Sequence, residues 1–375
     1  MHRKTSGLAT FLALAIAVAV TLNGQLASAD DEPLRVGFAE TDITPPEGFP
    51  IAGYYHERLA TGRVDPLKAK AMVIRQGTQS AALVVCDLGA IAVDLSHLVR
   101  NQASELTGIP AKNIVIAGTH SHTAPDYFKD LYLFLDGRRE NKIRSDYIAH
   151  LIGATTQSIV DANKALQLAA LEAGVAVQET PVSFNRRFVM RDGSVRTWMR
   201  FSSPEVVRSA GPIDPQIPIL KVMTADGKST TGVFSNFALH LDTVGGLKWS
   251  ADYPFFIETA VRAELGAGVV SLFGTGCCGD INHTDPNRAD RNMTDTIGNA
   301  LGQSVVAKLS DLQVVENTVL RVESAVVPLP LQSVDPGDLP AAIKLLAAAK
   351  KMEKVDFFEQ VTAYKQVLLD QFRAT

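Results

Sequence analysis

Three histidines in this sequence follow apolar runs that have the pattern of buried strands. His120 and His122 come after residues 113–117 in the segment NIVIAGTHSHTAP, and His240 ends the run SNFALH. Side chains alternate between two faces of an extended chain, so His120 and His122 are predicted to point to the same side. Imidazoles at the end of a sheet can bind a metal ion, or one can bind it while another transfers protons.

A lone H-x-H pair is more often part of a surface loop. Here a second strand end carries His240, and a third is followed by the glycine-rich segment GTGCCGD, which ends at Asp280. Three strand ends with polar groups in one chain favour a metallohydrolase pocket over a surface loop.

The remaining metal ligands are not fixed by spacing. A catalytic zinc site needs three protein ligands and an open position, and His120 and His240 supply two. Asp242 lies in the turn LDTVGG, and Asp252 lies in the loop WSADYP. Aspartates in loops most often stabilise turns. The alternative is that either one binds the metal or orients an imidazole.

The segment at residues 274–279 formally matches G-x-G-x-x-G, the pattern of dinucleotide-binding loops. No helix is predicted directly after it, so a dinucleotide site is not favoured. Two interpretations remain: an ordinary tight turn, or a loop whose amide groups point at a developing oxyanion. Cys277 and Cys278 in the same loop leave a further mechanism open, in which a thiol is the nucleophile.

Arg186 lies in the polar segment Asn185-Arg186-Arg187, which follows a predicted strand. A guanidinium at this position can hold a carbonyl or carboxylate group of a substrate. Without the other motifs, Arg186 would be interpreted as a surface arginine.

Hydrophobic periodicity predicts alternating strands and helices. Strands are predicted at residues 34–39, 69–75, 80–86, 113–117, 171–178, 217–223, 231–239 and 268–273. Helices are predicted at residues 93–106, 145–168, 255–265 and 294–309. Several strands are expected to pair as hairpins, so the expected fold is a mixed-sheet α/β layered metallohydrolase domain with flanking helices. Residues 329–340 are proline-rich and predict a linker, and residues 341–372 have a helical pattern.

The N-terminus has the pattern of a secretory signal peptide. Arg3 and Lys4 precede an apolar run at residues 8–22, which is followed by the small residues Ala27-Ser28-Ala29. We therefore expect a protein that is secreted or periplasmic. Without Arg3 and Lys4, 34 basic residues face 40 acidic ones, and the net charge changes from −4 to −6. This acidity argues against nucleic acid as a partner.

Taken in order, these segments resemble the neutral/alkaline non-lysosomal ceramidase family, whose members are zinc amidohydrolases that split N-acylsphingosine into sphingosine and a fatty acid. The resemblance runs from about residue 36 to residue 312, and its segments are VGFAETDITPP, ALVVCDLG, AGTHSHTAP, FNR, NFALH with WSAD behind it, and CCGDIN.

The resemblance implies one zinc ion (Zn²⁺) bound by His120 and His240, with His122 beside the scissile amide. It also implies that Arg186 faces the substrate. The catalytic residues expected from the matched motifs are His122, Arg186, Asp280 and Asn282. The residues expected to bind substrate are Gly276, Gly279 and Asp252. The expected partner is a small-molecule or lipid amide, with peripheral contact to membrane lipid.

Two features depart from the family pattern. The family's GDVSPN motif carries a serine needed for activity, and Asn282 stands in its place. Asn282 cannot be a hydroxyl nucleophile, although its amide could donate to an oxyanion. The family completes its zinc site with a glutamate and a tyrosine from a later region, and this sequence ends before anything comparable.

The expected organisation has three parts. Residues 1–29 are a signal peptide, residues 30–323 are a ceramidase-like catalytic domain, and residues 324–375 are a linker and helical segment of an incomplete C-terminal part. The expected function is an exported zinc-dependent amidohydrolase that uses metal-activated water. The alternative is a catalytically silent homologue that binds a lipid or glycoconjugate.

Overall fold

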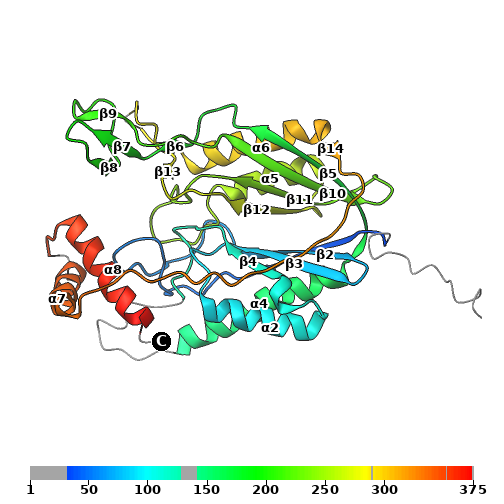
Figure 1. The fold of residues 1–375 in the computed structure, drawn as a ribbon, viewed down its shortest axis with the longest axis horizontal. Helices are drawn as coiled ribbons and strands as arrows, with labels where there is room; N and C mark the ends of the chain where they lie inside the picture. Colours follow the sequence, from blue (N-terminus) through cyan, green and yellow to red (C-terminus); the bar gives the residue numbers. More distant parts are fainter. Residues whose placement is uncertain (1–31, 128–141, 289, 352, 374–375) are drawn as a thin grey trace, which may run out of the picture.

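A mixed sheet of nine strands organises the fold, and its two halves face each other (Figure 1). The computed structural model describes residues 32–127, 142–288, 290–351 and 353–373. The strand order is β12-β11-β10-β5-β1-β2-β3-β4, and β14 pairs with β5. The strands of the sheet are β1 (Arg35–Asp42), β2 (Lys68–Gln76), β3 (Gln79–Cys86), β4 (Ile114–Gly118), β5 (Gln167–Val177), β10 (Gln216–Thr224), β11 (Thr230–Phe237), β12 (Val270–Thr275) and β14 (Gln313–Val314).

The two halves join where β1 meets β5. That junction has only two paired positions, Arg35 with Leu168 and Val36 with Gln167, whereas β1 pairs with β2 along its whole length. One half can therefore fold over the other. Apolar side chains of both halves form a shared core in which Val36 and Met72 pack with Leu272.

Helices cover the outer face of each half, which gives four layers in the order helix, sheet, sheet, helix (Figure 1). The helices α2 (Val93–Thr107) and α4 (Lys142–Lys164) lie on the β1–β4 half. The helices α5 (Pro254–Leu265) and α6 (Thr294–Lys308) lie on the other half. Each helix layer has its own buried core with the sheet beneath it. The predicted mixed-sheet α/β fold with flanking helices is confirmed.

Short helices of the 3₁₀ type also occur in the described part of the chain. They are η2 (Ala111–Asn113), η3 (Leu309–Asp311) and η4 (Pro336–Asp338).

Sequence periodicity placed the long elements within a few residues of their observed ends. The largest differences are four residues each: α4, predicted to reach residue 168, ends at Lys164, and β5, predicted from residue 171, begins at Gln167. The C-terminal helical pattern forms two helices instead of one, α7 (Leu339–Lys350) and α8 (Phe357–Arg373). The predicted signal peptide lies outside the described residues. No helix within the described ranges is long and apolar enough to cross a membrane.

Two smaller sheets extend from the upper half of the molecule. The strands β7 (Arg187–Met190), β8 (Val195–Thr197) and β9 (Val206–Ser209) form one of them. The strands β6 (Phe184–Asn185) and β13 (Ile281–Asn282) form the other. The β6–β13 pair holds the segment containing Arg186 next to the loop after β12, so it matters for the site.

A cluster of buried charges ties the two halves of the sheet together. Lys70 on β2 forms an ion pair with Glu258 on α5 and donates to the carbonyl of Ser271 on β12, at 2.9 Å. Glu258 also pairs with Lys68 and Arg262, and these two pair in turn with Glu40 on β1. The side chains of Lys70 and Glu258 are less than one-tenth exposed. If one partner is removed, water cannot readily solvate the charge that remains, so the loss is costly.

We expect Glu258→Gln to lower the free energy of unfolding by about 3–5 kcal/mol, because it leaves Lys70 buried without its carboxylate. Urea unfolding followed by circular dichroism measures this change. The matched control is Asp146→Asn, which breaks the exposed ion pair with Lys142 and should cost less than about 1 kcal/mol. Equal losses in the two variants would contradict a role for the buried cluster in joining the halves.

Candidate metal centre

The candidate site lies where two pairs of parallel strands end. The pair β3–β4 belongs to one half of the sheet and the pair β11–β12 to the other. Ligand-binding residues of α/β folds gather beyond the carboxyl ends of such strands. The hydroxyl of Thr275, at the end of β12, donates to the carbonyl of Thr119, just after β4, at 2.6 Å. The loops that follow the two pairs are thereby held against each other.

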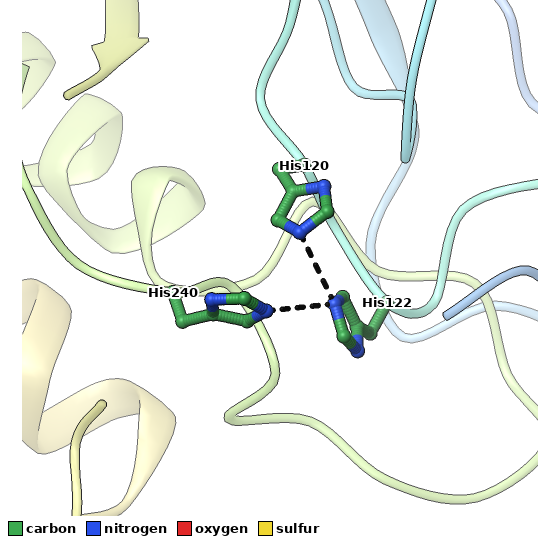
Figure 2. Close-up of side chains that lie close together, drawn as sticks. All are labelled: His120, His122 and His240. Carbon is green, nitrogen blue, oxygen red and sulfur yellow. Dashed lines mark hydrogen bonds between the residues drawn. The ribbon is translucent and has the colours of Figure 1, made fainter. Parts of the chain in front are cut away.

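Three histidine rings converge between these loops (Figure 2). His122 Nε2 lies 3.4 Å from His120 Nε2 and 3.1 Å from His240 Nε2. One nitrogen of each ring lies within 4.8 Å of the others. Tetrahedral coordination with zinc–nitrogen bonds of about 2.0–2.1 Å places ligand nitrogens about 3.3 Å apart. The observed spacing therefore fits a divalent ion bound by three imidazoles.

Backbone carbonyls orient two of the rings. His120 Nδ1 lies 2.7 Å from the carbonyl of Gly89, and His240 Nδ1 lies 3.2 Å from the carbonyl of Cys278. A carbonyl can only accept, so each Nδ1 carries the proton and donates it. Each Nε2 then presents its lone pair to the centre of the cluster, as histidine ligands of metals do.

The reason that His120 and His122 converge differs from the prediction. His120 has a φ of 71°, which is left-handed backbone and not an extended strand. The chain leaves the direction of β4 at this residue, and the two rings approach each other across a turn. A φ in this region is unusual for a residue other than glycine, and such conformations are common at functional sites.

Burial keeps the imidazoles of His122 and His240 neutral. Burial, with the neighbouring charges of His240 and His120, lowers the pKa of His122 to about 3, although Asp242 opposes this shift. Burial also lowers the pKa of His240, again against the charge of Asp242. Because a histidine binds a metal through its neutral form, both rings are ready to do so at neutral pH.

Two residues that the sequence analysis did not identify support His122. Gly53 has a φ of 92°, and a Cβ at this position would lie 2.5 Å from the Cβ of His122. The guanidinium of Arg58 donates to the carbonyl of His122 at 2.6 Å and also to the carbonyl of Ala52. Gly53 and Arg58 lie in the segment AGYYHER, some seventy residues before His122, so the sequence gives only a weak signal of their contact with it.

Asp242 lies two residues after His240, and its carboxylate contacts Asn282 and His283. Asn282 Nδ2 donates to the two Asp242 carboxylate oxygens at 3.1 and 3.3 Å, and His283 Nδ1 lies 3.1 Å from one of them. Burial alone would raise the pKa of Asp242, but His283 and the nearby histidines lower it to about 2. Asn282 was expected to donate to an oxyanion, and the structure instead turns its amide toward Asp242.

Asp252 has a structural position that differs from its predicted role in substrate binding. Its side chain is fully buried, and its oxygens accept from the backbone amides of Thr243, Val244 and Tyr253 and from the Thr243 hydroxyl. It also has a φ of 64°. Asp252 therefore shapes the turn after His240 and presents no surface to a substrate.

The glycine-rich loop does not present all its amides to a ligand. The amide of Gly276 donates to the carbonyl of Phe237 at 2.9 Å, so it continues the β11–β12 pairing and does not point at an oxyanion. The carbonyl of Gly279 accepts from Arg186, and the Asp280 carboxylate accepts from Asn185. Burial raises the pKa of Cys278, which does not favour a reactive thiolate there.

Arg186 lines a cavity of about 210 Å³. Asn282, which donates to Asp242, lines the same cavity, together with Trp198. The Arg186 guanidinium lies 5.5 Å from the centre of the Trp198 ring. Trp198 also has left-handed backbone, with a φ of 61°, and its ring contacts Phe357 at the start of α8. Arg186 contacts the carbonyl of Gly279, next to the residue whose carbonyl orients His240, and Asn282 contacts Asp242, two residues after His240.

Comparison with known proteins identifies the family of the chain. The sequence model of the family "Neutral/alkaline non-lysosomal ceramidase, N-terminal" matches residues 34–246. The chain belongs to this family. The neutral ceramidase of Pseudomonas aeruginosa is 27% identical over 239 residues, which is 61% of this chain and 33% of that protein.

The solved structures agree in fold. The crystal structure of the Pseudomonas aeruginosa neutral ceramidase matches with a TM-score of 0.58 and 21% identity, over 75% of this chain and 45% of that one. A ceramidase complexed with C2 matches with a TM-score of 0.59 and 21% identity, over 75% and 44% of the two chains. The chain thus spans about a third of its curated ceramidase relative and under half of these solved ceramidase structures.

We expect Gly53→Ala to weaken zinc binding by about 10-fold or more, because the added Cβ displaces His122 and misplaced ligands bind metal less tightly. Competition with a chromophoric chelator measures the affinity. The matched control is Gly48→Ala, since Gly48 has a similar φ of 80° but open space around its Cβ position. Equal affinities in the two variants would show that the contact with His122 is unimportant.

Proposed function

We propose that this chain is an exported metal-dependent hydrolase that cleaves the amide bond of an N-acyl lipid related to ceramide. The convergence of His120, His122 and His240 at the ends of parallel strands carries this proposal. Family membership supports the reaction class, and the ceramidase name of the relatives supports the substrate class.

The three histidines are proposed to hold one zinc ion. When bound, a divalent ion lowers the pKa of a coordinated water and polarises the acyl carbonyl. His120 and His240 are held by backbone carbonyls, so their rings stay fixed while the substrate enters and leaves. His122, which the resemblance assigned to the scissile amide, has its Nε2 close to both other rings and is proposed as the third ligand.

The substrate is proposed to lie along the cavity that Arg186 lines. Arg186 is held by the carbonyl of Gly279 and is partly exposed, so its guanidinium can still orient a carbonyl group. Asp280 anchors Asn185 on the adjacent strand β6 and so keeps this segment in place. Trp198 offers an apolar face on the same cavity for the acyl part.

Export and lipid contact are part of the same proposal. The signal-peptide pattern at residues 1–29 supports secretion or transport to the periplasm. The exposed Trp198 and Phe357 near the cavity support peripheral contact with membrane lipid, from which the substrate would be drawn.

We expect the mature chain to hold close to one zinc ion, and His120→Ala or His240→Ala to lose it together with hydrolysis of fluorescent N-acylsphingosine. Elemental analysis and product release measure the two properties. The control is His150→Ala, an exposed histidine on α4 outside the cluster. Variants that retain zinc without His120 and His240 would refute the proposed centre.

Lipid binding, chelators and thiol reagents separate the alternatives. A silent binding homologue would hold zinc and bind the lipid without releasing product. A cysteine hydrolase would be inhibited by thiol reagents through the exposed Cys277 but not by chelators. Activity lost to chelators and retained in Cys277→Ser would support the metal mechanism.

A further inference from the structure

The segment at residues 250–252 joins the turns that carry the three histidines. On one side, the carboxylate of Asp252 accepts from the amide of Thr243 at 3.0 Å and from the amide of Val244 at 3.2 Å, in the turn that follows His240. The Asp252 side chain is fully buried, so water does not compete for these hydrogen bonds. The position of this turn therefore depends on where the segment lies.

On its other side, the same segment contacts the turn that carries His120 and His122. The carbonyl of Ser250 accepts from the hydroxyl of Ser121 at 2.8 Å and from the hydroxyl of Thr123 at 3.1 Å. Ser121 lies between the two histidines in sequence, and Thr123 follows the second of them. Both hydroxyl-bearing residues are fully buried. One carbonyl group thus fixes the chain on both sides of His122.

Asp65 anchors this segment. One of its carboxylate oxygens accepts from the hydroxyl of Ser250 and the other from the amide of Ala251, each at 2.6 Å. The Ser250 hydroxyl oxygen accepts in turn from the amide of Asp252 at 3.0 Å. Asp65 is 4% exposed, and a carboxyl group this buried would be costly without such hydrogen bonds. All three residues of the segment are therefore bound to one side chain, directly or through the Ser250 hydroxyl.

Backbone pairing brings Asp65 to this position. The amide of Val64 donates to the carbonyl of Trp249 at 2.8 Å, and the amide of Trp249 donates to the carbonyl of Gly62 at 2.9 Å. Trp249 packs in the same buried core as Ala251. Asp65 directly follows the paired residues, so its side chain extends the contact between the two chain segments from Trp249 to Ala251.

We propose that Asp65 is a positioning residue of the metal centre: through Ser250, it fixes the two histidine-bearing turns relative to each other. Asp65 acts through hydrogen bonds and is not a member of the histidine cluster. This inference rests on the proposed function, because it concerns the geometry of the ligands around a bound ion. It also gives the segment WSAD, whose aspartate was expected to bind substrate, a role in positioning.

The test uses the folded mature chain with zinc alone, and competition with a chromophoric chelator measures the Kd. Asp65→Asn keeps the size of the side chain but replaces one of its two acceptor oxygens by a donor, so it cannot accept from both Ser250 and Ala251. We expect it to raise the Kd about 10-fold, because groups behind metal ligands affect affinity by orienting them. Ser121→Ala removes the hydroxyl between the two histidines and should raise the Kd by a similar factor.

The matched control is Tyr147→Phe. Tyr147 is also buried, and its hydroxyl donates to the carbonyl of Ile43 at 2.8 Å in the same core, away from the three histidines. Its loss should lower the urea midpoint and leave the zinc Kd within about 2-fold, since distant sites act independently. A purely structural role for Asp65 predicts this same pattern, a lower midpoint with an unchanged Kd.

Cobalt(II) in place of zinc gives a second readout, because its visible absorption depends on the geometry of its ligands. The bands of cobalt-loaded Asp65→Asn and Ser121→Ala should differ from those of the unsubstituted chain, and Tyr147→Phe should retain them. In the double variant of Asp65→Asn with Ser121→Ala, the rise in zinc Kd should be smaller than the product of the two single effects. Both changes break one chain of hydrogen bonds through Ser250, so their effects are not independent.

An unchanged zinc Kd in folded Asp65→Asn would overturn the inference, and so would independent effects of the two substitutions in the double variant. If Asp65→Asn does not fold, an unchanged Kd in Ser121→Ala overturns it instead. Failure of the unsubstituted chain to bind zinc would overturn the proposed function, and this inference with it.

Discussion

The packing of one half of the folded sheet against the other is the constraint on which the site depends. His120 and His122 follow a strand of one half, and His240 follows a strand of the other. Neither half alone brings the three rings together. The contact between Thr275 and Thr119 joins the halves beside the histidines, and the ion pair of Lys70 with Glu258 joins them within the layers. The geometry of the cluster therefore depends on how the two halves of the sheet pack together.

Burial of the cluster favours metal binding in one way and opposes it in another. Desolvation favours neutral imidazoles, which bind metal ions, but it raises the cost of the ion's own charge. Burial alone would raise the pKa of Asp242, two residues after His240, but His283 and the neighbouring histidines lower it to about 2. The hydrogen bonds to its carboxylate come from Asn282 in β13, a segment far from His240 in the sequence. A loop that resembles a catalytic motif can thus serve a positioning role.

The sequence predicted the elements of this fold well, since long apolar runs such as residues 80–86 can be buried in few other ways. It also predicted that His120, His122 and His240 belong to one site. It gave the wrong reason for the first two, because alternation describes a strand and His120 lies in a left-handed turn. Gly53, Arg58 and His283 were missed, since their contacts with the site depend on tertiary packing and leave no pattern in the sequence. Asp252 was misassigned because a buried turn aspartate and a ligand look alike in sequence.

X-ray absorption spectroscopy of the zinc-loaded mature chain can show whether the three histidines bind the metal. A centre built from the three histidines predicts three imidazole nitrogens at about 2.0–2.1 Å from the metal. A spectrum with sulfur at about 2.3 Å would place zinc on the cysteines of the glycine-rich loop and contradict the account. Zinc with fewer than three imidazole ligands would likewise contradict a centre built from all three histidines.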